Sequence, residues 1–149
     1  MVETIINTKT NVKDSDEIIE LLGQQLMDSG FVKETYVEAV LKREKTLPTG
    51  LKTGFVNVAI PHTDVTHVNK SAIAISTLEK PVNFSLMEDP TKEVGVEFVF
   101  LLAVKEPGEQ TKLLKSLMSI FQNKELLNQM KNAKDSRSLN DILKSSLFL

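Results

Sequence analysis

Two histidines, His62 and His67, are the residues of this sequence best suited to chemistry near neutral pH. An imidazole can act as a neutral nucleophile or become a cation in that pH range. The stretch that holds them begins at Phe55, and its residues alternate up to Ile60 in a pattern that predicts a short strand. Pro61 has no N–H to donate, so it ends the hydrogen-bond ladder of that strand. His62 is therefore predicted to lie just beyond a strand end, where ligands meet the protein in open α/β sheets.

The turn after Pro61 offers hydrogen-bond partners for an imidazole or a bound anion. Thr63 and Thr66 carry hydroxyls, and Asp64 carries a carboxylate. A phosphohistidine site needs a neutral imidazole nitrogen in the open and a hydrogen bond that orients the other nitrogen. It also needs donors or a cation for the phosphoryl oxygens. A solvated histidine in a surface loop is the simpler alternative, and position in the sequence alone leaves it open.

Other kinds of site lack the residues they require. The glycines are scattered singly, so there is no glycine-rich phosphate loop, and no serine has the setting of a hydrolase nucleophile. The chain has no cysteine, which excludes disulfides, thiolate zinc sites and a cysteine nucleophile. His62 and His67 do not have the spacing of a known zinc motif and further ligands are not evident, so a metal site is a minor alternative.

The composition is that of a globular protein. Its 149 residues are 41% hydrophobic and 26% charged, which predicts one domain over residues 1–149. A net charge of −2 without a basic run gives no reason to expect nucleic acid. The longest apolar run, Phe98–Val104, is too short to cross a bilayer, and the N-terminus lacks a signal pattern. With the absence of cysteine, these features predict a soluble protein of the cytoplasm with no direct membrane insertion.

The elements before the histidines are predicted to be a short strand and two helices. A brief extended start at residues 5–6 is followed by a polar connection. Asp14, with a Glu three residues on, forms a capping-box pattern that starts a helix, and Gly30 suits the end of that helix. A second helix is predicted over about 33–46, and Pro48 forbids its continuation.

Three strands are predicted after the histidines. The apolar start of residues 72–78 predicts a strand buried on both faces. Residues 81–84 predict a brief further strand, too close to its predecessor for a crossover helix, so we expect these two to pair antiparallel. Residues 94–104 are β-branched and aromatic with little polarity, and we expect them to form the central strand.

Three helices are predicted in the C-terminal part. One runs from about 110 to 122, Asn123 caps a second, and Ser138 with Asp141 starts a third that uses Leu147. Strands separated by helices indicate the α/β class. We therefore expect a single-domain sandwich with a mixed, mostly parallel sheet of roughly four or five strands flanked by helices.

The string Ile60-Pro61-His62, preceded by Asn57-Val58-Ala59, resembles the phosphorylation site of a known family. The family is the fructose–mannitol class of phosphotransferase system (PTS) enzyme IIA domains. The longer string Pro61-His62-Thr63-Asp64, followed by His67-Val68, is most similar to the galactitol-type branch. The resemblance covers nearly the whole chain, and it implies that His62 carries a phosphoryl group and that no cofactor is needed. It also implies a mixed sheet of about five strands flanked by helices.

Arg43 is the cation best suited to a phosphoryl group, because a guanidinium pairs two oxygens and stays charged. On spacing alone, a solvated Arg in the last turn of a helix is the better explanation, since the helix dipole favours a cation there. Arg43-Glu44, followed by Thr49 and Gly50, matches the family's Arg-Glu helix end and Thr-containing loop. The resemblance implies that Arg43 and Thr49 help to hold the phosphoryl group, with Thr63 as a possible supporting residue.

One departure from the resembled family concerns a second histidine. Members of the mannitol and fructose branches often have it at the start of the helix after the central strand, where this chain has Gln110. An amide can donate a hydrogen bond to a phosphoryl oxygen but cannot exchange a proton at neutral pH. Transfer would then use no second histidine at that position, or it would use His67 instead. The alternative for His67 is that it is a surface loop residue without a role in transfer.

The resemblance implies a phosphotransferase that works as a phosphocarrier. It would accept a phosphoryl group on His62 from the phosphohistidine carrier protein and pass it to a cognate IIB component for sugar uptake, with galactitol indicated by the resemblance alone. Such encounters are small and weak, and Phe55, Val65 and Val68 are candidates for an apolar ring around His62. A regulatory, nitrogen-type IIA homologue is the main alternative, and a binding module that is not phosphorylated is a third.

Overall fold

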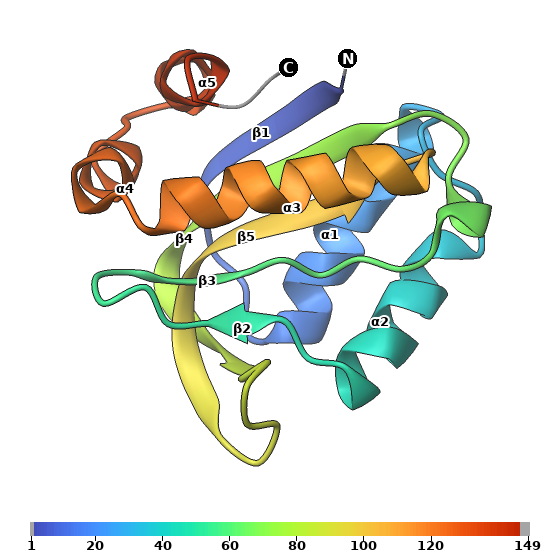
Figure 1. The fold of residues 1–149 in the computed structure, drawn as a ribbon, viewed down its shortest axis with the longest axis horizontal. Coiled ribbons are helices and arrows are strands. Elements are labelled where there is room, and N and C mark those ends of the chain that lie inside the picture. Colours follow the sequence, from blue (N-terminus) through green and yellow to red (C-terminus); the bar gives the residue numbers. More distant parts are fainter. Residues whose placement is uncertain (1, 147–149) are drawn as a thin grey trace.

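The computed structural model describes residues 2–146, and it forms one five-stranded sheet with helices on both sides (Figure 1). Leu147, predicted to belong to the last helix, lies outside the described residues. The strands are β1 (Glu3–Thr10), β2 (Gly50–Leu51), β3 (Asn57–Ala59), β4 (Ala72–Ser85) and β5 (Glu93–Ala103). The helices are α1 (Ser15–Asp28), α2 (Tyr36–Thr46), α3 (Pro107–Phe121), α4 (Lys124–Lys131), α5 (Ser136–Lys144) and the short 3₁₀ helix η1 (Val65–His67).

The sheet is mixed, as predicted, with the strand order β1-β4-β5-β3-β2. β1 runs parallel to β4 and β3 parallel to β5, whereas β4 with β5 and β2 with β3 are antiparallel. The expectation that parallel pairing would predominate is wrong, because β4 and β5 form a long hairpin at the centre and β2 folds back on β3. The α/β class, the central place of β5 and the flanking helices are confirmed.

β4 corrects the prediction of two separate strands at 72–78 and 81–84. It is one strand that pairs antiparallel with β5 along its length, and its register shifts between Thr77 and Val82. Pro81 lies within this irregularity, where its missing N–H breaks no regular ladder bond. The predicted boundary between two strands is therefore an irregularity inside one strand.

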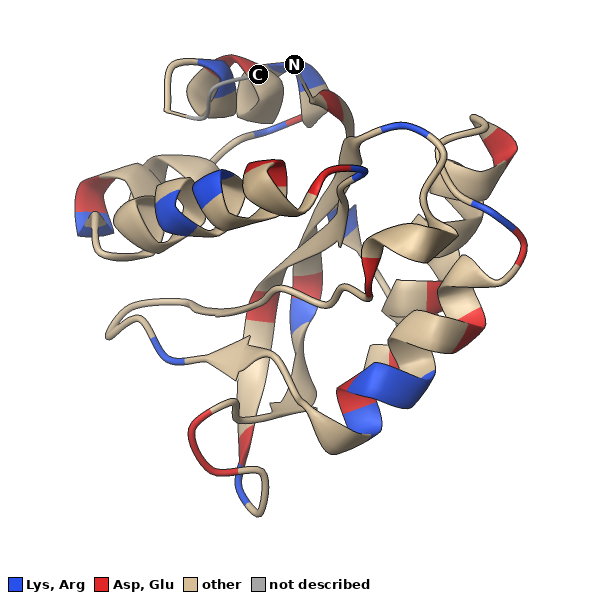
Figure 2. Ribbon diagram, turned by 45° about the vertical axis from the view of Figure 1, so that its right-hand side comes forward, with Lys and Arg blue, Asp and Glu red and all other residues tan. Residues whose placement is uncertain are grey.

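Two apolar cores lie on the two faces of the sheet. Alternate residues of β5 face opposite sides: Phe98, Phe100 and Leu102 belong to the core under α3, α4 and α5. Val99 and Leu101 belong to the core under α1 and α2. Most Lys, Arg, Asp and Glu positions lie on the helices and connecting loops (Figure 2). Burial on both faces explains why β5 reads as a nearly continuous apolar run.

Local capping signals set most helix ends. Asp14 accepts from the N–H of Glu17 at 2.9 Å at the start of α1, and Gly30 follows that helix with a φ of 80°. Asn123 caps α4, as predicted. The predicted Ser138 start of α5 is wrong, because Asp135 accepts from the N–H of Ser138 at 2.8 Å and begins the helix earlier.

Two other helices begin away from their predicted positions. α2 starts at Tyr36 instead of Lys33, because the N–H of Lys33 donates to the His67 carbonyl at 2.9 Å and holds the chain extended there. α3 starts at Pro107 instead of about Gln110. Proline suits the first helical position because its missing N–H would have no intrahelical partner.

We expect Gly50→Ala to destabilise the protein, because an added Cβ would lie 2.6 Å from the Ser85 carbonyl oxygen. Overpacking of this kind costs about 1–3 kcal/mol. Gly108→Ala is the matched control, since nothing lies within 4 Å of its added Cβ. Urea unfolding of both variants measures the difference in the free energy of unfolding. A Gly50→Ala protein as stable as Gly108→Ala would contradict the close approach of β2 to the end of β4.

Candidate functional site

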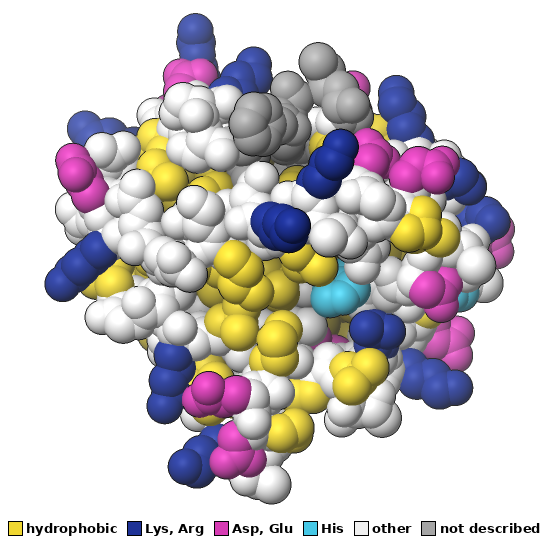
Figure 3. Space-filling model, viewed as in Figure 1, with side chains coloured by type: hydrophobic (Ala, Val, Ile, Leu, Met, Phe, Trp, Pro, Cys, Tyr) yellow, Lys and Arg dark blue, Asp and Glu magenta, His cyan; other side chains and the backbone are white. Residues whose placement is uncertain are grey.

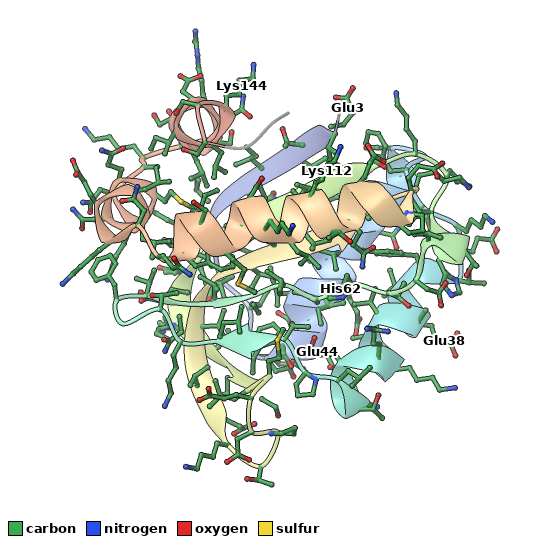
Figure 4. The ribbon with its side chains drawn as sticks, in the orientation of Figure 1. Glu3, Glu38, Glu44, His62, Lys112 and Lys144 are labelled. Carbon is green, nitrogen blue, oxygen red and sulfur yellow. The ribbon has the colours of Figure 1, made fainter. Side chains whose placement is uncertain are left out.

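His62 lies at the edge of the sheet where β3 and β5 both end. β3 stops at Ala59, and the chain continues alongside β5 through a bridge between His62 and Leu102. The N–H of Leu102 donates to the Pro61 carbonyl at 3.0 Å. The strand end before His62 is confirmed, and parallel pairing brings α3, which follows β5, to the same edge. Figure 4 labels His62 within this arrangement.

One nitrogen of the His62 imidazole is fixed by the backbone two residues before it. Nδ1 lies 2.7 Å from the carbonyl oxygen of Ile60. A carbonyl oxygen can only accept, so Nδ1 carries the proton and donates in this bond. The neutral ring then has its free lone pair on Nε2. Nε2 is therefore available as a nucleophile, and no base is needed to remove a proton from it.

Three influences act on the pKa of His62, and together they lower it below the usual 6.5. Burial lowers the pKa most, because the cation is poorly solvated in this position. The hydrogen bond to the Ile60 carbonyl raises it in part, and the charge of Arg43 lowers it further. His62 is therefore neutral at pH 7, the state that a nucleophilic imidazole requires.

Arg43 faces the same site from the last turn of α2. It lines two pockets that His62 also lines, one of about 340 Å³ and one of about 390 Å³. Its Nε is buried, and among residues 2–146 it has no hydrogen-bond partner. The simple alternative of a solvated helix-end arginine does not describe this half-buried side chain. The guanidinium keeps donors available for an anion beside His62.

Thr49 lines the 390 Å³ pocket with His62 and Arg43, and its side chain is only 2% exposed. Its N–H and its hydroxyl each donate to Glu44, to Oε2 and Oε1 respectively, at 2.8 Å. Thr49 is thus placed with the other residues predicted for the site. Its single hydroxyl proton is already used by Glu44.

Glu44 is a residue of this region whose role the sequence reasoning missed. Burial raises its pKa to about 7, and the two bonds from Thr49 lower it in part. A signal was present, because Tyr36 and Val40 are buried on α2 and Glu44 follows at the same spacing of four. A carboxylate on the buried stripe of a helix indicates a specific partner.

The turn after His62 brings two polar side chains, Thr63 and Asp64, to the 340 Å³ pocket. Thr63 is buried and lines the 340 Å³ pocket with His62. Asp64 also accepts from the N–H and hydroxyl of Thr66 at the start of η1. These bonds from Thr66 hold the pKa of the Asp64 carboxyl below its usual value. Thr66 is therefore occupied by Asp64, and Thr63 is the hydroxyl that the turn brings to the pocket.

His67 and Gln110 have different relations to His62. His67 Nδ1 lies 2.7 Å from the Thr35 hydroxyl, and the residue lines another cleft, which Arg43 also lines but His62 does not. Gln110, in the first turns of α3, lines the 340 Å³ pocket with His62 and Arg43. The structure thus brings Gln110 to the predicted place and does not bring the two histidines into one pocket.

An apolar surface adjoins His62, but its residues are not those that we predicted. Val68 is buried in the core, and Phe55 lies at the other end of β3 beside Lys124 and Lys131. Of the predicted ring, only Val65 lines a pocket with His62. The sequence does not show which end of a short strand will be near the site.

The observed surface consists of Leu47, Pro48, Met87, Pro90, Leu114 and Met118, which we call the apolar rim. Leu47 and Met87 are exposed large side chains of this rim, at 55% and 41%. Figure 3 shows hydrophobic side chains gathered beside the histidine on this face. Exposed large apolar side chains next to a reactive group are typical of a docking surface.

The described part of the chain lacks two other kinds of feature. Residues 2–146 contain no group of three or more His, Cys, Asp or Glu side chains arranged to hold a metal ion. Over the same residues, every helix is too short or too polar to cross a membrane.

Comparison with known proteins identifies the family and related chains. Residues 2–146 match the family model described as phosphoenolpyruvate-dependent sugar phosphotransferase system, EIIA 2. The galactitol-specific EIIA component of Escherichia coli strain K12 is 28% identical over 127 residues, covering 85% of this chain and 84% of that protein. The mannitol-specific enzyme IIA component of Staphylococcus aureus strain N315 is 30% identical over 137 residues, covering 91% and 89%.

The fold is also similar to a solved structure of a complex. This is the complex of enzyme IIAMTL and phosphorylated enzyme IIBMTL from Escherichia coli. The match has a TM-score of 0.75 and 23% identity, and it covers 94% of each chain. At this identity the similarity shows the fold that the two chains share.

We expect nuclear magnetic resonance to find neutral His62 with its proton on Nδ1 at pH 7. Long-range ¹H–¹⁵N spectra distinguish the two neutral forms of the ring, and a pH titration should give a midpoint below 6.5. The bond to the Ile60 carbonyl places the proton on Nδ1. Burial, together with the charge of Arg43, lowers the pKa that the titration measures. A proton on Nε2, or a midpoint above 6.5, would contradict the geometry of the site.

Proposed function

Since the chain belongs to the phosphoenolpyruvate-dependent sugar phosphotransferase system EIIA 2 family, we propose that it carries a phosphoryl group on Nε2 of His62. PTS IIA components are phosphotransfer proteins, so the family sets the kind of reaction. The observation that carries the choice of residue is the bond from Nδ1 to the Ile60 carbonyl, which leaves Nε2 as the free lone pair. A burial-lowered pKa keeps that nitrogen unprotonated.

The transfer itself needs no base. The Nε2 lone pair attacks the phosphorus of the donor phosphohistidine, a bond from phosphorus to Nε2 forms, and the bond to the donor nitrogen breaks with its electron pair left on that nitrogen. Arg43 lies beside the site of this exchange and supplies hydrogen bonds and charge to the phosphoryl oxygens. Gln110 can add a neutral donor from the first turns of α3, whose positive dipole end lies at this edge.

Two protein partners fit this chemistry: the phosphohistidine carrier protein as donor and a IIB component as acceptor. The apolar rim gives both a surface next to His62. A solved complex of a IIA and a phosphorylated IIB component with this fold supports the acceptor. In this role the protein works in the cytoplasm and supplies phosphoryl groups for sugar uptake. Galactitol is the proposed sugar because a galactitol-specific component is among the relatives.

We expect His62→Ala to abolish acid-labile phosphorylation and His67→Ala to leave it intact. His67 is bonded to Thr35 and lines a separate cleft, so it serves as the matched control. The protein is incubated with phosphoenolpyruvate, enzyme I and the histidine carrier, and its intact mass is measured. Full labelling of the His62→Ala protein would end the proposal.

We expect Arg43→Ala to slow phosphoryl transfer by about tenfold to a thousandfold, as for the loss of one charge-assisted contact. The fold should survive, because Arg43 is half-buried at a helix end and its Nε bonds no other described residue. Rapid-quench kinetics give the rate, and circular dichroism checks the fold. Lys42→Ala removes a neighbouring exposed cation and should keep the parent rate. Equal slowing of both variants would assign the effect to general charge.

A further inference from the structure

A chain of hydrogen bonds connects Glu44 to the reacting imidazole. Glu44 accepts from the N–H and hydroxyl of Thr49, each at 2.8 Å. The carbonyl of Thr49 accepts from the N–H of Ile60 at 3.4 Å. The carbonyl of Ile60 accepts from His62 Nδ1 at 2.7 Å. Glu44 does not itself line the 390 Å³ pocket, but through Thr49 it holds one wall of it.

The position of Glu44 makes its charge sensitive to conditions near neutral pH. It follows Tyr36 and Val40 on the core-facing side of α2, and its side chain is half-buried. Burial raises its pKa to about 7, and only the bonds from Thr49 oppose this. A carboxyl group with this pKa changes charge where the protein would work.

Few titratable groups face Glu44. On its own helix the adjacent charge is Arg43, and beyond Thr49 it is His62. Residues 47–51 and β3 contain no titratable side chain, and the β4–β5 turn presents apolar side chains to the pocket. The shift of the Glu44 pKa has burial as its largest cause, opposed by the two bonds from Thr49. A phosphoryl group on His62 would bring an anion into the pocket that Thr49 lines, next to the residue that Glu44 bonds.

Thr49 has one hydroxyl proton, and the charge of Glu44 decides where it points. An ionised carboxylate can only accept, so it takes both the N–H and the hydroxyl of Thr49. A protonated Glu44 has an O–H of its own to donate to the Thr49 hydroxyl oxygen. The hydroxyl proton of Thr49 is then free to donate into the pocket that His62 lines. Thr49 can thus serve a phosphoryl oxygen through its hydroxyl when Glu44 is neutral.

We propose that Glu44 is a positioning residue whose protonation is coupled to phosphorylation of His62. When the phosphoryl group is on Nε2, the Glu44 carboxylate takes up one proton from solvent and becomes a neutral carboxyl group. The hydroxyl of Thr49 then turns from Glu44 to a phosphoryl oxygen. The proton is separate from the transfer, in which phosphorus leaves the donor nitrogen and bonds to Nε2. A new anion near a carboxylate favours its neutral form, and this inference rests on the proposed function of His62.

The test compares the equilibrium phosphorylated fraction of the parent and of Glu44→Gln between about pH 6 and pH 8.5. The amide of Gln can accept from the Thr49 N–H and donate to its hydroxyl oxygen, so it imitates neutral Glu44 at every pH. Relative to this variant, the parent should lose phosphorylation by up to about tenfold per pH unit above the pKa of Glu44. The phosphoryl group and the carrier protein titrate in both samples, so their contributions cancel.

Glu38→Gln is the matched control. Glu38 lies on the same helix and is exposed, and Figure 4 shows it on the outer side of α2. The Glu38→Gln substitution removes the same charge from the helix and leaves the Glu44–Thr49 bonds in place. The pH profile of this variant should therefore equal that of the parent. A second measurement, a ¹³C titration of the Glu44 carboxyl, should give a higher pKa in the phosphorylated protein than in the unmodified protein.

The outcomes separate this inference from the proposed function. Phosphorylation of His62 with identical pH profiles for the parent and Glu44→Gln would overturn the inference and leave the function intact. A phosphorylated fraction that Glu44→Gln lowers equally at every pH would do the same, because a purely structural role predicts it. If Glu44→Gln does not fold, the ¹³C titration decides, and a pKa unchanged by phosphorylation overturns the coupling. Absence of phosphorylation at every pH would overturn both.

Discussion

The hydrogen bond from His62 Nδ1 to the Ile60 carbonyl is the contact on which the site depends. It selects one neutral form of the imidazole and so makes Nε2 the nucleophile. β3 ends at Ala59, just before the residue whose carbonyl accepts this bond. The neighbouring bond between Pro61 and Leu102 keeps the turn against β5. Strand pairing therefore determines the chemistry of a side chain beyond the strand.

Electrostatics at this site rest on a balance between two requirements. His62 must be neutral to act as a nucleophile, and burial beside Arg43 lowers its pKa accordingly. A phosphoryl group on the same ring would be strongly anionic, and the donors of Arg43 then become favourable partners. The same cation thus favours the reactive state before transfer and the charged state after it. Its buried, unpartnered Nε shows that no other described side chain competes for it.

Features with a local cause could be predicted from the sequence. Asp14 and Gly30 bound a helix through their own backbone chemistry, and β5 is apolar because both its faces are buried. Thr49, Arg43 and Gln110 were placed near His62 through the resemblance to a family, and the structure does bring them to pockets that His62 lines. Their roles in transfer stay predictions.

Features set by distant contacts could not be predicted. Pro81 suggested a strand boundary, but pairing with β5 carries β4 through it as a bulge. Phe55 was expected near His62, although direction along β3 puts it at the other end. The apolar rim joins α2, α3 and the β4–β5 turn, and no local pattern connects these segments. The Glu44–Thr49 pair depends on the path of the loop between them.

The most direct test of the account is the atom to which phosphorus bonds. Long-range ¹H–³¹P and ¹⁵N–³¹P spectra of the protein, phosphorylated by its donor and labelled with ¹⁵N-histidine, distinguish the two ring nitrogens. The account predicts phosphorus on Nε2 of His62, because Nδ1 is occupied by the Ile60 carbonyl. Phosphorus on Nδ1 of His62, or on another residue, would contradict it.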